Sequence, residues 1–242
     1  MQSQKDNIAF TPIGVLRTVF DHKFGTPRQG ALAPSSRAHF HLAPEWRGMG
    51  LFDGLEGFSH AWLLSHFHQN KNTRRAGKVH PPRLEGEAVG ILASRSPHRP
   101  NSIGLTLARI ERVDGDHLEL SGVDLIDQTP ILDIKPYLAE ADRPATFASG
   151  WAERLQSAPM LCEFSQEADR DIDGLCGSGQ VKDRERFVNL VREVLVLDPR
   201  PLAYRRRINE RFAIVLGGMD VHARFNDGVF TVVQVAPFPA DQ

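Results

Sequence analysis

Short apolar runs separated by turn-forming residues dominate the chain up to about residue 138. Runs rich in Ile, Val, Leu and Phe, and bounded by Gly, Pro, Asp or Asn, are typical of β-strands. We expect seven strands, at Phe10–Thr18, Ala38–Leu42, Phe58–Phe67, Ala88–Ser94, Ile103–Val113, His117–Gly122 and Ile131–Ile134. Only Pro44–Leu55 resembles a short helix, and Val113–His117 resembles a hairpin turn. Seven strands with so little helix predict a barrel or a sandwich.

The apolar pattern changes in the last quarter of the chain. Residues spaced by three and four positions predict an amphipathic helix from Asp183 to Leu197, and Pro199 and Pro201 end it. The apolar positions of this helix are Phe187, Leu190, Val191, Val194 and Leu195. We expect three further strands, at Phe212–Leu216, Val221–Phe225 and Val229–Val235. The segment Asn226-Asp227-Gly228 is a hairpin turn between the last two strands.

These two patterns predict a mainly β fold, with an N-terminal β-barrel domain and a small α+β C-terminal domain. Residues 1–140 would form the barrel domain and residues 159–242 the C-terminal domain. The apolar signal weakens over residues 141–158, which are expected to be a linker.

Composition narrows the class of protein. The chain has 242 residues, of which 41% are hydrophobic and 24% charged, as in an ordinary globular protein with a real core. The two cysteines, Cys162 and Cys176, do not form a CxxC pair, which favours a reducing compartment. Neither a signal peptide nor a membrane-spanning apolar run is apparent. We therefore expect a cytoplasmic protein that has no membrane partner.

Charge and missing motifs exclude several function classes. The net charge of −1 argues against a chain that is basic throughout, as many DNA-binding proteins are, and we expect no DNA partner. The sequence contains neither a GxGxxG motif after a strand nor a GxxxxGK[ST] motif, so neither a dinucleotide-binding fold nor a P-loop is indicated. It also lacks the GxSxG motif of serine hydrolases.

Four dense polar segments interrupt the strand pattern and carry the candidate chemistry. They are Thr26–Gln29, Phe67–Asn70, Arg95–Asn101 and Asp127–Tyr137. The third segment holds two arginines and two prolines, and proline limits the entropy that a loop loses when it binds a ligand. In the fourth segment, a strand would point Asp133, Lys135 and Tyr137 to one face and Ile134 to the other. Both a functional face and a salt-bridged strand end fit this pattern.

These segments resemble motifs of one family. RSPHRPNSIGL is similar to the RSxFRPNPIGL motif of the TrmO/YaeB (TsaA-like) family, and DLIDQTPILDIKPY is similar to its DLxDGTPxxDIKPY motif. TPRQ, PPRLEG, EGFSHAWLLSHFHQN and DPRPLAY also match, in order, over about residues 8–235. Gln128 stands where the family usually has Gly, and DPRPLAY has an additional Leu202.

The resemblance implies a dimeric β-barrel tRNA methyltransferase that binds S-adenosylmethionine without a Rossmann fold. The implied reaction is methylation of N6 of threonylcarbamoyladenosine, next to the anticodon of certain tRNAs. On this reading the partners are tRNA and a second copy of the chain, and the barrel domain holds the cofactor.

The resemblance also implies the site residues, motif by motif. The expected cofactor-binding residues are Arg28, Gln29, Gly30, His68, Gln69, Arg95, Leu105, Asp127, Gln128, Thr129 and Pro130. The expected catalytic residues are Asp133, Lys135, Tyr137, Asp198 and Arg200. The expected tRNA-binding residues are Arg99, Tyr204, Arg205, Arg206 and Arg207. No metal is expected, because methyl displacement mainly requires alignment of the nucleophile, the methyl group and the sulfur.

Two other functions remain open at this level. The HxH pairs His39-Phe40-His41 and His66-Phe67-His68 lie on predicted strands, so each pair would share one face, as in a metal-dependent hydrolase or oxygenase. Polar histidines on a half-exposed strand explain the same pattern. The chain could also be a non-enzymatic module that binds tRNA or another ligand through its polar loops.

Overall fold

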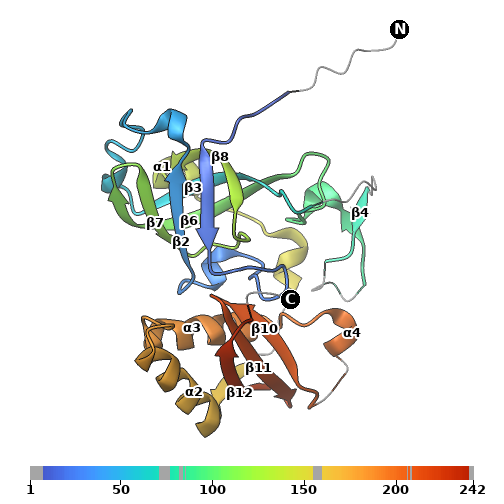
Figure 1. Ribbon diagram of the computed structural model, residues 1–242. Helices are drawn as coiled ribbons and strands as arrows, with labels where there is room; N and C mark the ends of the chain where they lie inside the picture. The colour runs from blue at the N-terminus through green and yellow to red at the C-terminus, as the bar shows by residue number, and fades with distance from the viewer. Residues whose placement is uncertain are drawn as a thin grey trace.

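Two units stacked one above the other make up the computed structural model (Figure 1). It describes residues 8–70, 77–81, 84, 86–154, 160–205, 207 and 209–239. The upper unit in this view is a closed barrel, and the lower unit is a sheet covered by two helices. The predicted class, mainly β with an N-terminal barrel and a small α+β C-terminal domain, is confirmed.

Six antiparallel strands close the barrel in the order β1-β2-β7-β6-β3-β8. They are β1 (Gly14–Thr18), β2 (Arg37–Leu42), β3 (His60–His66), β6 (Ile103–Asp114), β7 (His117–Ser121) and β8 (Thr129–Pro136). The strands close because alternate residues are apolar and fill the interior. Leu16, Phe40, Leu63 and Leu118, from four different strands, are fully buried.

Short segments complete the N-terminal unit. They are η1 (Gly30–Leu32), η2 (Pro44–Trp46), η3 (Leu55–Gly57), β4 (Lys78–Val79), β5 (Val89–Gly90), η5 (Ile91–Ala93), α1 (Ala139–Asp142) and η6 (Gly150–Arg154). The predicted strand Ala88–Ser94 is wrong, because only Val89–Gly90 is extended and it pairs with β4 outside the barrel. The predicted helix Pro44–Leu55 is replaced by two separate 3-10 turns.

A four-stranded sheet in the order β10-β11-β12-β9 forms the core of the C-terminal unit. Its elements are β9 (Leu161–Phe164), α2 (Gln166–Gly177), α3 (Arg184–Leu195), α4 (Leu202–Arg205), β10 (Phe212–Leu216), β11 (Met219–Asn226) and β12 (Val229–Pro237). The helix predicted at Asp183–Leu197 is α3, and Asp183 caps it by accepting a hydrogen bond from the Arg186 N–H. The predicted turn is confirmed, with Asp227 and Gly228 at positive φ.

The pattern on α3 and the β10–β12 strands was readable in sequence, whereas α2 was not predicted. Its buried face consists of only three residues, Ala168, Ile172 and Leu175, and two glycines lie in its second half. Among the described residues, none of the helices has the length and apolar character needed to cross a membrane.

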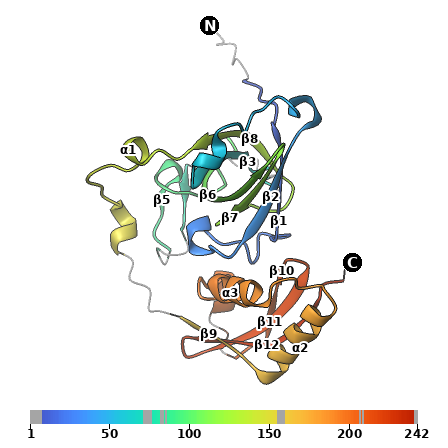
Figure 2. The ribbon, with the colours of Figure 1, turned by 90° about the vertical axis from the view of Figure 1, so that its left-hand side faces the viewer.

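Helix α3 lies against the barrel (Figure 2), and two of its side chains hydrogen-bond to Ser35, which precedes β2 by two residues. The carboxylate of Glu193 accepts hydrogen bonds from the Ser35 N–H (2.9 Å) and Oγ (2.7 Å). One face of the same helix also carries Arg186, whose Nε donates to the Ser35 carbonyl at 2.9 Å. Beside this clamp, the Gly217 N–H donates to the Val19 carbonyl at 2.8 Å. Two side chains of one helix therefore bind the backbone and the hydroxyl of Ser35.

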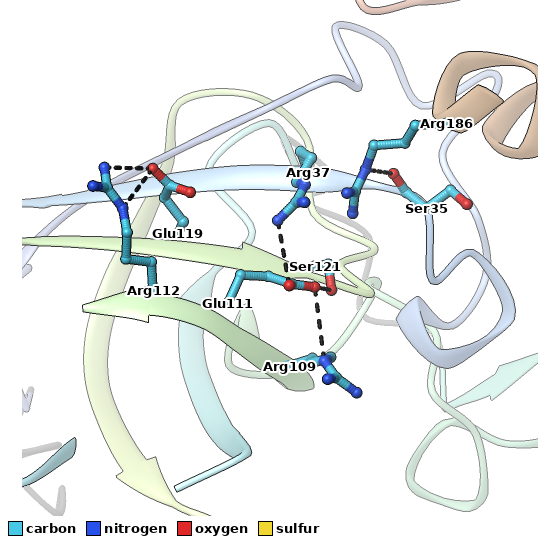
Figure 3. Close-up of polar contacts among 8 residues, drawn as sticks. All are labelled: Ser35, Arg37, Arg109, Glu111, Arg112, Glu119, Ser121 and Arg186. Carbon is cyan, nitrogen blue, oxygen red and sulfur yellow. Dashed lines mark hydrogen bonds and ion pairs between the residues drawn. The ribbon is translucent and has the colours of Figure 1, made fainter. Parts of the chain in front are cut away.

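A charged cluster on the barrel wall lies next to this clamp (Figure 3). Ile110 pairs with Leu120 and Arg112 with Glu119, so Glu111 lies in a bulge of β6. The Glu111 carboxylate accepts a hydrogen bond from Ser121 Oγ at 2.5 Å, which lowers its pKa below the ordinary value. Arg37, at 3.5 Å, and Arg109, at 3.8 Å, form ion pairs with the same carboxylate. The bulge therefore gathers polar and charged side chains from three strands on the surface beside α3.

Candidate functional site

The loop Thr26–Gln29 and the loop that follows η5 meet at one end of the barrel. Arg95 Nη1 donates to Gln29 Oε1, and Gln29 Nε2 donates to the Arg28 carbonyl. Arg28 and Arg95 are both exposed, whereas Gln29 is half-buried between them. Three of the predicted cofactor residues are therefore in one place, although Gln29 and Arg95 are 66 positions apart in sequence.

Gly30 anchors this loop against the segment that follows β7. A Cβ at Gly30 would stand 1.9 Å from the Gly122 carbonyl oxygen and 3.1 Å from Val123 Cα. No side chain fits there, so only glycine permits this approach of the two backbones. Gly30 is buried and shapes the predicted site through its backbone.

Asp124 is a functional candidate that the sequence analysis missed. Its Oδ1 accepts a hydrogen bond from Thr106 Oγ1 at 2.5 Å, and its carboxylate also accepts one from the Gly30 N–H. Burial raises the pKa of Asp124 above the ordinary value, although these hydrogen bonds and the charge of Arg95 act in the opposite direction. Asp124 is the first residue of the motif DLIDQTPILDIKPY, and this position was the available signal. One carboxylate thus connects β6, the Thr26–Gly30 loop and the Arg95 loop.

The segment Asp127–Pro130 leads into β8 beside this cluster. Asp127 Oδ1 accepts the Thr18 N–H at 2.8 Å, and Gln128 Nε2 donates to Asp127 Oδ2 at 3.3 Å. Gln128 has a φ of 65°, in the left-handed region that glycine adopts readily. Thr129 is buried and donates to the Ile126 carbonyl, while Pro130 pairs with Val15 of β1.

His68 and Gln69 lie just beyond the end of β3. The His68 N–H donates to the His66 carbonyl at 2.8 Å, which turns the chain, so His66 and His68 do not share a strand face as expected. Burial, followed by the nearby His66, lowers the pKa of His68, and Asp127 partly offsets both. The Gln69 carbonyl accepts a hydrogen bond from Lys23 Nζ at 3.3 Å. His68 is therefore close enough to the Asp127 segment for the two to interact electrostatically.

The motif residues Asp133, Lys135 and Tyr137 lie on the outer wall of the barrel. Lys135 Nζ and Asp133 Oδ2 form an ion pair at 3.0 Å. The ring of Tyr137 lies 6.3 Å from Trp62 and 6.5 Å from His60, centroid to centroid. The predicted division of faces is confirmed, since Asp133 and Lys135 pair with Leu64 and Trp62, which alternate with buried β3 residues.

Tyr137 is distant from the His68 loop within one chain. The Tyr137 N–H donates to the His60 carbonyl at the start of β3, whereas His68 follows its end. Seven residues of strand span about 20 Å. Leu105, another predicted cofactor residue, also lies on the outer wall, where it pairs with Leu64 and is 58% exposed.

Asp198 and Arg200 are buried inside the C-terminal unit. Arg200 donates to the Asp198 carboxylate through Nε (2.8 Å) and Nη2 (3.2 Å), and its guanidinium lies 4.0 Å from the centre of the Phe225 ring. Arg205 pairs with the same carboxylate at 3.2 Å. Each of Asp198 and Arg200 is only 5% exposed, so neither side chain is available to a substrate in this arrangement.

The predicted tRNA-binding residues fall in different environments. Tyr204 is 45% exposed, and the guanidinium of Arg207 lies 4.4 Å from the centre of its ring. Arg99 donates to the Ser94 carbonyl at 2.8 Å and stabilises its own loop. Arg206 lies outside the described residues.

The histidines of β2 interact with each other and with β7. The rings of His39 and His41 both stack on His117, with centroids 5.3 Å and 4.4 Å away. His39 Nδ1 lies 3.2 Å from His117 Nε2. The three histidines therefore contact one another on the barrel surface. Within the described part of the chain, no group of three His, Cys, Asp or Glu residues could hold a metal ion.

Asp124 gives a testable dependence of stability on pH. Because its pKa is raised on folding, the folded protein takes up a proton, and stability falls as the pH rises from 3.8 through the folded-state pKa. The Asp124→Asn variant lacks the titrating group, so this dependence should disappear. The difference in unfolding free energy, variant minus wild type, should therefore increase as the pH rises through that window. Urea unfolding at several pH values measures this difference.

The contrasting variant is Asp124→Ala, which leaves Thr106 and the Gly30 N–H without their acceptor. It should lose about 1–3 kcal/mol of stability at neutral pH, more than the Asn variant does. Parallel pH profiles for wild type and Asp124→Asn would mean that Asp124 does not change protonation on folding.

Comparison with known proteins identifies the family. The model of the tRNA-methyltransferase O N-terminal domain matches residues 15–143, and the model of the TrmO C-terminal domain matches residues 157–238. A Pseudomonas aeruginosa protein, whose name includes the words S-adenosylmethionine-dependent methyltransferase, is 39% identical over 88% of this chain and 90% of its own. The Escherichia coli tRNA (adenine(37)-N6)-methyltransferase is 36% identical over 94% of this chain and 97% of its own. The crystal structure of TrmO from Pseudomonas aeruginosa superposes with a TM-score of 0.79 and 32% identity, covering 95% of this chain and 98% of that one. The chain therefore belongs to the tRNA-methyltransferase O family.

Proposed function

We propose that the chain is an S-adenosylmethionine-dependent tRNA methyltransferase that methylates N6 of threonylcarbamoyladenosine next to the anticodon. The observation that carries this proposal is the convergence of the Gln29, Arg95 and Asp124 segments at one end of the barrel. The name of the Escherichia coli relative supports the substrate class.

The side chains at this end of the barrel fit a zwitterionic cofactor. Exposed Arg28 and Arg95 suit the methionine carboxylate, and the carboxylates of Asp124 and Asp127 suit ammonium or ribose hydroxyl groups. The close approach of Gly30 to Gly122 and Val123, which no side chain permits, holds the Thr26–Gly30 loop beside the Asp124 segment. His68, Gln69, Gln128, Thr129 and Pro130 complete the proposed lining. When bound, the cofactor supplies the methyl group.

Asp133, Lys135 and Tyr137 are proposed to act on the tRNA base. The Asp133 carboxylate is oriented by its ion pair with Lys135 and can accept the N6 proton. Tyr137 and Trp62 offer aromatic rings on which a base can stack.

The buried pair Asp198 and Arg200 is proposed to position the loop that carries Tyr204, because both side chains are occupied by each other and by Phe225. Tyr204 would stack on tRNA, while Arg99 and the Arg205–Arg207 run would contact its anionic groups.

We also propose a homodimer formed through the outer wall of β3 and β6. Ile103 and Leu105 are 40% and 58% exposed there, and half-buried Leu64 lies opposite Leu105, as Trp62 lies opposite Leu107. A contiguous exposed apolar face is typical of an interface. A second copy on this wall would lie beside Tyr137 and Lys135, whose separation from the His68 loop leaves the site divided within one chain.

The remaining proposals concern organisation and location. Residues 1–140 would be the cofactor-binding domain, residues 141–158 a connector and residues 159–242 a domain that contributes to tRNA binding. The family-model matches at 15–143 and 157–238 are consistent with this division. We place the protein in the cytoplasm, where its tRNA substrate is.

Incubation with isotopically labelled S-adenosylmethionine and tRNA that carries threonylcarbamoyladenosine tests the proposed reaction. Nucleoside mass spectrometry should detect the N6-methylated product. Asp133→Asn should have a turnover rate at least about 100-fold lower than that of wild type, with unchanged cofactor affinity, if Asp133 accepts the proton. If incubation with the wild-type protein yielded no N6-methylated nucleoside, the proposed function would be rejected.

Arg95→Ala should weaken S-adenosylmethionine binding by about 1.5–3 kcal/mol, because a charge-assisted hydrogen bond to the methionine carboxylate would be lost. Titration calorimetry measures the affinity, with and without EDTA, and EDTA should have no effect. Arg224→Ala, which removes an exposed arginine from the C-terminal sheet, is the matched control. Equal affinity of Arg95→Ala and wild type would remove Arg95 from the cofactor site.

Leu105→Glu should convert the dimer to a monomer at micromolar concentration, because it places a charge within the apolar wall. Sedimentation velocity measures the change. Leu161→Glu is the matched control, since Leu161 is equally exposed, at 58%, but lies in β9. A wild-type chain that sediments as a monomer while fully active would contradict the dimer.

A further inference from the structure

A pocket of about 230 Å³ lies at the junction of the two units, and we call it the junction pocket. The loop Lys23–Arg28 lines it from the barrel side. The end of α3 and the Asp198–Pro201 segment, together with Arg205, line it from the C-terminal side. Residues of two motifs, TPRQ and DPRPLAY, therefore face one small cavity, although the motifs are about 170 positions apart.

The charge of this lining is strongly unbalanced. Among the described residues, it contains four cations, Lys23, Arg28, Arg200 and Arg205, but one carboxylate, that of Asp198. The lining therefore has a formal excess of three positive charges. Cations gathered around a small cavity with low-dielectric walls raise the local concentration of anions.

Asp198 offsets only one of these four charges, and its oxygens hold the arginines in place. Its carboxylate is paired with Arg200 at 2.8 Å and with Arg205 at 3.2 Å. Its carbonyl accepts from Arg205 Nη2 at 3.1 Å and from Arg28 Nη2 at 3.5 Å. The αL conformation of Asp198, with a φ of 48°, directs these two groups to arginines of both units. Asp198 therefore keeps the three arginines close to one another.

The surroundings of the pocket suit a nucleic acid. Arg200 also lines a second, smaller hollow together with exposed Tyr204 and Arg207. An aromatic ring capped by a guanidinium, directly beside a cationic cavity, offers one surface for a base and another for an anionic group. Lys23 reaches from this cavity to the Gln69 carbonyl, so the cavity borders the proposed cofactor site.

We propose that the junction pocket is an oxyanion site that binds an anionic group of the tRNA substrate. Two groups of such a substrate share this chemistry, a backbone phosphate and the carboxylate of the threonylcarbamoyl group. Lys23 from the barrel side and Arg205 from the C-terminal side would contact the anion directly, while buried Arg200 stays paired with Asp198. This inference rests on the proposed function only in naming tRNA as the carrier of the anion.

Lys23→Gln is the main test, since Lys23 is exposed and Gln retains a donor for the Gln69 carbonyl. The variant should bind tRNA several-fold more weakly at low salt, and the slope of log affinity against log salt should be reduced by about one. The double variant, Lys23→Gln with Arg205→Gln, should reduce this slope by about two. Lys182→Gln, at an exposed lysine between α2 and α3, is the matched control and should behave as wild type.

Two tRNA preparations distinguish the sources of the anion. A loss of affinity for tRNA with and without the threonylcarbamoyl group identifies a backbone phosphate, whereas a loss only for the modified tRNA identifies the carboxylate. Unchanged tRNA affinity and salt slope in Lys23→Gln would overturn the proposal. A weaker S-adenosylmethionine affinity in that variant would also overturn it, because the pocket would then belong to the cofactor site.

Inorganic phosphate tests the site independently of the proposed reaction. Millimolar phosphate should raise the melting temperature of wild type and of Lys182→Gln more than that of the Lys23→Gln, Arg205→Gln double variant, at matched ionic strength. Equal shifts for all three proteins would reject an oxyanion site. A failure of wild type to methylate tRNA, with the phosphate effect retained, would reject the proposed function and leave the site supported.

Discussion

Closure of the six-stranded barrel is the constraint from which the rest of the molecule follows. A barrel this small has no room for a ligand, because alternate residues such as Leu16, Phe40 and Leu118 fill it completely. Polar chemistry must therefore lie on the outer wall or in the loops at the ends. Both locations are used, since the Asp133–Lys135 pair lies on the wall while Arg95, Gln29 and Asp124 gather at one end.

The elements that could be predicted from the sequence are those whose buried residues follow a single, continuous pattern. Helix α3 buries a continuous stripe, and β10 is uniformly apolar, so both were located within two residues. Helix α2 buries only three residues and contains glycines, so its signal is too weak to recognise. The apolar run Ala88–Ser94 looked like a strand, but Ile91–Ala93 forms a 3-10 turn and Leu92 is 74% exposed. Apolar content alone does not separate strand from exposed turn.

The residues of the candidate site also fall into those that the sequence indicated and those that it did not. The motifs indicated which loops would matter, and the structure brings Gln29 and Arg95 together as a hydrogen-bonded pair. They gave no indication that Asp198 and Arg200 would be buried against Phe225, because a charged pair in a loop pattern reads as exposed. The role of Asp124 depends on Thr106 and Gly30, which come from separate parts of the chain. Relations of this kind arise from the tertiary fold and leave no local periodicity.

The serine clamp on α3 affects how this protein must meet its substrate. Arg186 and Glu193 lie seven residues apart, or two turns, and hold the carbonyl, N–H and hydroxyl of the same Ser35. Rotation of α3 about its axis by a fraction of a turn would break all three hydrogen bonds together. The C-terminal unit therefore has little freedom to swivel, and the angle between the units is set during folding. An incoming macromolecule meets a preformed corner, so little of its binding energy is consumed in arranging the two units.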